Sequence, residues 1–225
     1  MGHSPVNGRA LPIFLLAACA IPTIFGMIRA GEIIITGHWT FDFVADVVDR
    51  LPLFLHVVGA VGFLVLGAFQ VLPGFRHRHP IWHRRSGPVA IPLGIIGAVS
   101  GLWMTLAHGE ISGPLLFWGR IGASCVWIGA MALSVGAITH RDFRAHGRWI
   151  IRAYALALPA GTLAFILLPM VMILGEDGHD LLFEVVQVLA WPLHLAAAEW
   201  IIRRRDAHRG RQAQMLEARR NQVRI

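Results

Sequence analysis

Six stretches of this chain are apolar for long enough to cross a lipid bilayer as α-helices. A bilayer core of about 30 Å requires roughly 20 residues at about 1.5 Å per residue. The stretches are Leu11–Ile28, Leu51–Leu72, Pro88–Ala107, Pro114–Thr139, Trp149–Leu174 and Leu181–Ile202. Only 15% of the residues are charged and the mean hydropathy is +0.60, whereas a soluble domain carries about 25% charged residues. The sequence therefore predicts an all-α integral membrane protein, a bundle of six transmembrane helices.

The charged residues set the orientation of this predicted bundle. The chain has no lysine, and all but three of its 20 arginines fall in one set of connections or in the terminal tails. The opposite connections carry the acidic residues Glu32, Asp42, Asp46, Asp49, Glu110, Glu176, Asp177 and Asp180. Basic connections stay cytoplasmic, so we expect both termini in the cytoplasm and a multi-pass location in the bacterial inner membrane. The net charge of +7 then faces anionic lipid headgroups, and we expect no nucleic-acid partner.

The same pattern divides the chain into three parts. Residues 1–10 form a cytoplasmic tail, residues 11–202 form the transmembrane domain with its core at about 51–174, and residues 203–225 form a basic cytoplasmic tail that extends the last helix. The longest connection on the acidic side, residues 31–50, is either a short amphipathic helix on the membrane surface or a packed loop.

Polar residues at membrane depth are candidates for function because lipid cannot solvate them. Four lie in the outer third of their spans and are predicted to form a polar layer: His56, Arg120, Glu184 and Gln187. Because an unpaired arginine is costly there, we expect Glu184 to pair with Arg120. Gln70 near the inner end of the second span, and His194 in the inner half of the last, are further candidates; the alternative for His194 is a helix–helix hydrogen bond.

A second polar group lies where the third and fifth spans begin. His83 precedes the third span and His146 opens the fifth, and because both spans run in the same direction their histidines should reach a similar depth. This arrangement predicts haem b with an imidazole on each side of the iron. Arg84, Arg148 and Arg152 would pair with the haem propionates. Two alternatives stay open: these residues only contact lipid phosphate, or they hold another anionic ligand or a lipid.

Three sequence elements resemble a bacterial family of predicted membrane proteins, the domain of unknown function 2306. They are Leu55-His56 with Gln70, His79-Pro80-x-x-His83-Arg84-x-x-Gly87, and Ala145-His146-x-Arg148-Trp149 followed by Arg152 and Tyr154. The likeness covers roughly residues 50 to 200. It implies a six-span bundle and no established activity.

A looser likeness is to two-haem b-type membrane cytochromes, whose histidines lie on four consecutive central spans, paired two with four and three with five. Spans two, three and five of this chain offer His56, His83 and His146. The fourth span departs from the pattern, because it has Arg120 where a ligand would be needed. The likeness therefore implies at most one haem, at the inner end.

No phosphate-binding glycine loop, zinc-protease helix motif or nucleophile elbow occurs, so soluble-enzyme chemistry is not indicated. Two hypotheses follow. The first is a membrane redox protein with haem b between His83 and His146, serving a quinone or another membrane redox protein. The second is a non-enzymatic carrier, assembly factor or lipid-binding protein whose buried histidine, arginine and glutamate side chains hold an anionic ligand.

Overall fold

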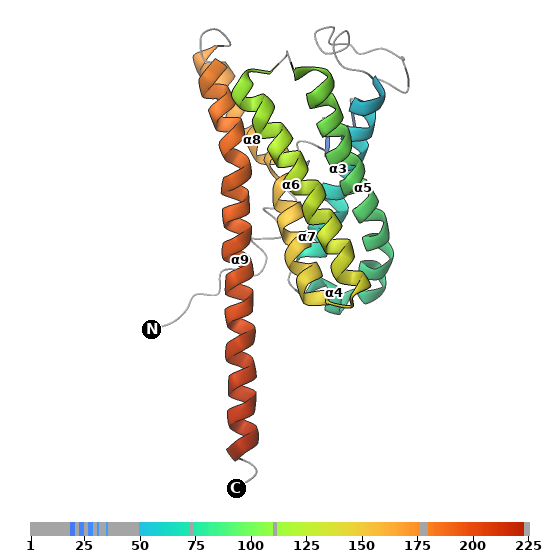
Figure 1. Ribbon diagram of the computed structural model, residues 1–225, viewed down its shortest axis with the longest axis vertical. Coiled ribbons are helices and arrows are strands. Elements are labelled where there is room, and N and C mark those ends of the chain that lie inside the picture. The colour runs from blue at the N-terminus through green and yellow to red at the C-terminus, as the bar shows by residue number, and fades with distance from the viewer. Residues whose placement is uncertain are drawn as a thin grey trace.

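The computed structural model describes residues 50–72, 74–109, 112–175 and 180–222, with eight further positions between residues 19 and 35. Its helices are α3 Arg50–Val71, α4 Phe75–Arg78, α5 Pro80–Ala107, α6 Pro114–Thr139, α7 Phe143–Ala157, α8 Pro159–Leu174 and α9 Asp180–Gln222. All regular structure in the described residues is helical, as the sequence predicts. Helices α3, α5, α6 and α7 form a bundle, and α9 runs along its side and continues past the end at which α4 lies (Figure 1).

Five helical segments of the described part are long and apolar enough to cross a membrane. They are Leu51–Val71, Pro80–Ala107, Pro114–Thr139, Phe143–Leu174 and Leu181–Gln222. Large apolar side chains such as Val126, Leu133 and Ile166 are about half exposed on the outside of these helices. Water would penalise such a surface, whereas lipid tails match it. Most of the predicted first span, residues 11–28, and most of the connection at residues 31–50 lie outside the described residues.

Two of the predicted boundaries are wrong, and both corrections place histidines on helices. Helix α5 begins at Pro80 instead of Pro88. Proline is favourable in the first helical position, because the N–H that it lacks would have no partner within the helix there. Helix α7 begins at Phe143 instead of Trp149. The Asp142 carboxylate caps it by accepting hydrogen bonds from the backbone N–H groups of Arg144 and Ala145, at 3.1 and 2.9 Å.

The fifth predicted span is one apolar stretch but two helices. Pro159 has no N–H to continue the hydrogen-bond ladder, and it becomes the first residue of α8, after α7 has ended at Ala157. The last helix behaves in the opposite way. Helix α9 runs for 43 residues, about 64 Å at about 1.5 Å per residue, which is twice the thickness of a bilayer core. The expected extension of the last span into the tail is therefore confirmed.

Close backbone contact joins α3 to α5. A Cβ atom added to Gly59 would lie 2.5 Å from the Gly97 nitrogen, and one added to Gly97 would lie 2.8 Å from the Ala60 nitrogen. The Gly97-x-x-x-Gly101 spacing permits such a contact, and the structure shows it at Gly97. Small residues at this crossing let the two helices approach far more closely than larger side chains would allow.

An aromatic core fills the centre of the bundle. Phe63 is 1% exposed, and its ring centroid lies 5.8 Å from that of Trp127 and 6.0 Å from that of Tyr154. The Tyr154 hydroxyl donates a hydrogen bond to the Leu64 carbonyl oxygen at 3.1 Å. Its oxygen also lies 3.3 Å from the Cys19 sulfur. Side chains from α3, α6 and α7 thus meet at one buried point.

Substitution of Gly97 by alanine should destabilise the protein by about 1–3 kcal/mol, because the new methyl group has to displace the backbone of α3. Thermal unfolding in detergent, followed by circular dichroism, measures the effect. Gly129→Ala is the matched control, since nothing lies within 4 Å of a Cβ atom at that position. Equal melting temperatures for the two variants would contradict the close helix contact.

Candidate functional site

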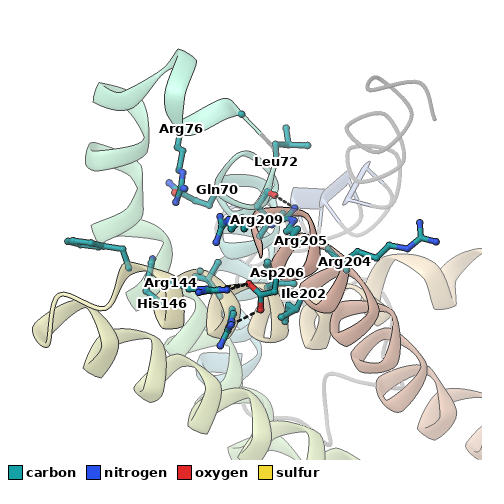
Figure 2. A pocket seen from close by; sticks show the side chains of 18 of the residues that line it. Gln70, Leu72, Arg76, Arg144, His146, Ile202, Arg204, Arg205, Asp206 and Arg209 are labelled. Atoms are coloured by element: carbon teal, nitrogen blue, oxygen red, sulfur yellow. Dashed lines mark hydrogen bonds and ion pairs between the residues drawn. The ribbon is translucent and has the colours of Figure 1, made fainter. Parts of the chain in front are cut away.

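His83 on α5 and His146 on α7 both line two adjoining pockets. The larger, about 800 Å³, lies among α3, α5, α6 and α7, and we name it the His83–His146 pocket. The smaller, about 520 Å³, lies among the neighbouring ends of α3, α7 and α9, with α4 and α5 at its edge (Figure 2). We name it the arginine pocket, because its lining includes Arg76, Arg144, Arg148, Arg204, Arg205 and Arg209.

The two imidazoles have different partners. His146 Nδ1 lies 2.8 Å from the Ser134 hydroxyl oxygen and 3.2 Å from the Ser134 carbonyl oxygen, both on α6. A carbonyl can only accept, so Nδ1 carries the hydrogen whenever it bonds that oxygen, and Nε2 is then the nitrogen with a free lone pair. His83 Nδ1 is buried and has no hydrogen-bond partner among the described residues. Each ring therefore retains a nitrogen that a ligand can engage.

Gln70 belongs to this end of the bundle. Its side-chain amide donates hydrogen bonds to the Ser86 hydroxyl at 2.7 Å and to the His83 carbonyl oxygen at 3.3 Å. Ser86 in turn donates to the Trp82 carbonyl oxygen at 2.8 Å. This network ties the end of α3 to the first two turns of α5, and it fixes the backbone that carries His83.

Two of the three arginines expected near a haem propionate, Arg148 and Arg152, already have carboxylate partners. Arg148 donates to Asp206 at 2.6 Å, and Arg144 donates to the other oxygen of the same carboxylate at 3.1 Å (Figure 2). Arg152 donates to both oxygens of Glu199, at 2.5 and 3.1 Å, and its guanidinium lies 4.5 Å from the centroid of the Trp149 ring. Helix α9 is thereby held against α7 by two carboxylates.

Other arginines at this end of the bundle form fewer contacts with carboxylates. Arg84 is exposed at the edge of the His83–His146 pocket. Arg205 donates to the Val71 carbonyl oxygen at 3.1 Å, which caps the last turn of α3. In Figure 2, Arg76, Arg205 and Arg209 gather around one side of the arginine pocket, with Asp206 as the single labelled acid.

A third pocket, about 430 Å³, contains part of the predicted polar layer. His56, Arg120 and Gln187 all line it, and we name it the His56–Arg120 pocket. His56 Nδ1 lies 2.8 Å from the Gly97 carbonyl oxygen, at the crossing of α3 and α5. Arg120 donates to the Ser112 hydroxyl at 2.6 Å.

The expected pair between Arg120 and Glu184 is wrong. Glu184 accepts a hydrogen bond from the backbone N–H of Leu116 at 3.1 Å, in the first turn of α6. The N–H groups in the first turn of a helix have no backbone partner and attract a carboxylate. The Glu184 carboxylate binds there instead of pairing with Arg120. His194 has the alternative role foreseen for it: Nε2 lies 3.2 Å from the Thr162 hydroxyl on α8, and Nδ1 lies 2.7 Å from the Ala190 carbonyl oxygen.

A model of the family described as "Predicted membrane protein (DUF2306)" matches residues 53–202, two-thirds of the chain. The chain belongs to this family. The match begins just before His56 and includes both histidines of the His83–His146 pocket. No curated protein and no solved structure matches the chain.

Sequence reasoning missed several functional neighbours in this DUF2306 protein. Ser134 lies within an apolar stretch that gives it no distinguishing signal, yet it contacts the ring of His146. Glu199 and Asp206 lie in the last helix, and they pair with arginines of α7. The available signal was their spacing, which puts both acids on nearly one face of a continuous helix, since seven residues is almost two turns.

Replacement of Asp206 by asparagine should lower the free energy of unfolding by about 1 kcal/mol at low salt, because the partly exposed pairs with Arg144 and Arg148 are lost. Melting temperatures at about 0.05 M and about 1 M salt measure this, since screening shortens the Debye length to roughly 3 Å at 1 M. Glu217→Gln, at an exposed position further along α9, is the control. A loss of stability that is equal at both salt concentrations would show that packing, not charge, holds α9 there.

Proposed function

We propose that this DUF2306 protein is a multi-pass membrane electron-transfer protein that binds haem b in the His83–His146 pocket. The observation that carries the proposal is that imidazoles from two different helices line one pocket of about 800 Å³. Ligand pockets of this kind occupy roughly 300–1,000 Å³ and are mostly apolar. His83 and His146 would hold the iron of this haem, each through one imidazole nitrogen.

The hydrogen bonding of the His146 ring fits a ligand of a metal. A metal-bound histidine donates its other ring N–H to a carbonyl, carboxylate or water, which fixes the ring and raises its basicity. Ser134 offers such a carbonyl to His146 Nδ1 at 3.2 Å. Gly87 leaves space beside the rings, since a Cβ atom there would meet only the Gln70 side chain, at 3.9 Å. A flat macrocycle can therefore approach the backbone of α5 closely.

The propionates need cations that are not already neutralised. Arg148 and Arg152 have Asp206 and Glu199 as partners, so their sequence-based role would require a propionate to displace a carboxylate. Arg84 at the edge of the pocket and Arg76 in the adjoining arginine pocket are the better partners. When bound, haem b supplies one-electron redox chemistry. The chain's own residues orient it and exclude water, with Phe63 and Tyr154 closing its apolar side.

A second candidate function is supported by the arginine pocket itself. Its cations Arg76, Arg205 and Arg209 surround a space of about 520 Å³ at one end of the spans, where lipid phosphates lie in a membrane. An anionic headgroup would satisfy them without any haem. In that case the protein is a lipid-binding or assembly protein, and the purified material is colourless.

The arrangement of the ends supports six spans with both termini in the cytoplasm of a bacterial inner membrane. The connection between α6 and α7, helix α4 and the emerging tail of α9 gather at the same end of the bundle (Figure 1). That end carries the arginine pocket, as the positive-inside rule requires of a cytoplasmic face. With five spans in the described part, a sixth at residues 11–28 returns the N-terminus to this side.

Reporter fusions measure this topology. Alkaline phosphatase fused after Arg141 or after the last residue should be inactive, because both positions would be cytoplasmic, whereas fusion after Gly175 should be active. Green fluorescent protein at the same three positions should give the reverse pattern. Active phosphatase after Arg141 would refute the proposed orientation.

Visible absorption of the purified protein measures haem binding. The wild type should show a haem band that sharpens on reduction, His83→Ala and His146→Ala should lose it, and Ser134→Ala should bind haem about tenfold more weakly because the ring of His146 loses a partner. His140→Ala, at an exposed position between α6 and α7, is the control and should keep the band. A colourless wild type that also binds no added haem would overturn the proposal.

A further inference from the structure

The His56–Arg120 pocket lies inside the bundle, apart from the two pockets at His83. Residues of six helices line it, from α3 and α5 to α9. Leu53, Met104, Leu163 and Trp191 give it an apolar wall. Its volume of about 430 Å³ suits a ring-sized ligand.

Its polar groups include two donors with unused capacity. Within residues 50–72, 74–109, 112–175 and 180–222, no carboxylate pairs with Arg120, and its one bond is the short one to the Ser112 hydroxyl. A guanidinium carries five N–H groups, so most of its donors remain. Trp127 is 7% exposed, and its buried indole N–H has no hydrogen-bond partner among the described residues. Leaving such donors unpaired in a lipid environment is costly, which favours a ligand with acceptor oxygens.

The pocket also contains acceptors. His56 Nδ1 lies 2.8 Å from the Gly97 carbonyl oxygen, which can only accept, so Nδ1 carries the hydrogen. In the neutral ring, Nε2 is then a hydrogen-bond acceptor. The Gln187 amide nitrogen donates to the Phe183 carbonyl oxygen at 3.2 Å, which leaves the side-chain oxygen of Gln187 free to accept. A ligand that only accepts hydrogen bonds would therefore leave the acceptors of His56 and Gln187 without a donor.

The broken span supports the view that this is a built cavity. Ala157, which ends α7, and Pro159, which begins α8, both line the pocket. An interruption of a transmembrane helix is tolerated where it faces protein or a cavity instead of lipid. In transporters such interruptions lie beside the bound ligand. The interruption here lies at the pocket that Arg120 also lines.

We propose that the His56–Arg120 pocket binds the head ring of a lipid-soluble quinone and its quinol. Such a ring has two oxygens on opposite sides. In both redox forms, one oxygen can accept hydrogen bonds from Arg120 and Trp127; in the quinol, the hydroxyl on the other side can also donate to His56. The apolar walls hold the ring, and the tail extends into lipid. A carboxylate headgroup places both oxygens on one carbon, so it satisfies the arginine alone. Binding needs no haem; only electron exchange with the ring rests on the function proposed above.

Tryptophan fluorescence of the full-length protein in phosphatidylcholine nanodiscs tests this. Quinones quench indole emission, and Trp127 and Trp191 line the pocket. Titration with a decyl-substituted dimethoxybenzoquinone should give saturable quenching in the wild type. Arg120→Gln should weaken the binding about tenfold or more, because it removes a charged hydrogen-bond donor. Trp127→Phe should weaken it severalfold through loss of one N–H. Arg85→Gln, at an exposed position outside this pocket, is the control and should bind like the wild type.

Equal affinities for the wild type and a folded Arg120→Gln variant would overturn the proposal, as would saturable binding of decanoate that the quinone cannot displace. Melting temperatures identify variants that fail to fold. If Arg120→Gln fails to fold, the folded Trp127→Phe variant gives the comparison, and an affinity equal to that of the wild type would overturn the proposal. The haem band of the same samples reports separately on His83 and His146. A wild type that binds quinone without haem refutes only the proposed function, and one that binds haem without quinone refutes only this inference.

Discussion

The crossing of α3 and α5 at Gly59 and Gly97 determines where the polar side chains of this protein lie. The two backbones come so close that a Cβ atom on either glycine would collide with the other helix. The Gly97 carbonyl at this crossing is also the partner of His56. Towards the other end of the same pair, Gln70 bonds the backbone of α5 beside His83. One helix contact thus positions residues of two separate pockets.

An aromatic side chain connects these pockets. Phe63 lines the His83–His146 pocket and packs against Tyr154, which lines it too. On its other side Phe63 packs against Trp127, a residue of the His56–Arg120 pocket. The two sites therefore share a wall of packed aromatic rings.

Depth in the membrane could be read from the sequence, but rotation about each helix axis could not. The regular rise of a helix placed His83 and His146 near one level, and the structure puts both in one pocket. It likewise grouped His56, Arg120 and Gln187. The partner of Arg120 was wrong because the choice between Ser112 and Glu184 depends on how α6 and α9 face each other. The span limits differed for a related reason: arginine-rich turns continue a helix beyond its apolar part, so hydropathy ends too early.

Helix α9 continues without a break from Pro192 to Gln222. Glu199 and Asp206 hold the middle of this rod to α7, close to His146. The part of α9 that continues past the bundle in Figure 1 is therefore joined, through one unbroken helix, to the contacts beside the histidine pocket.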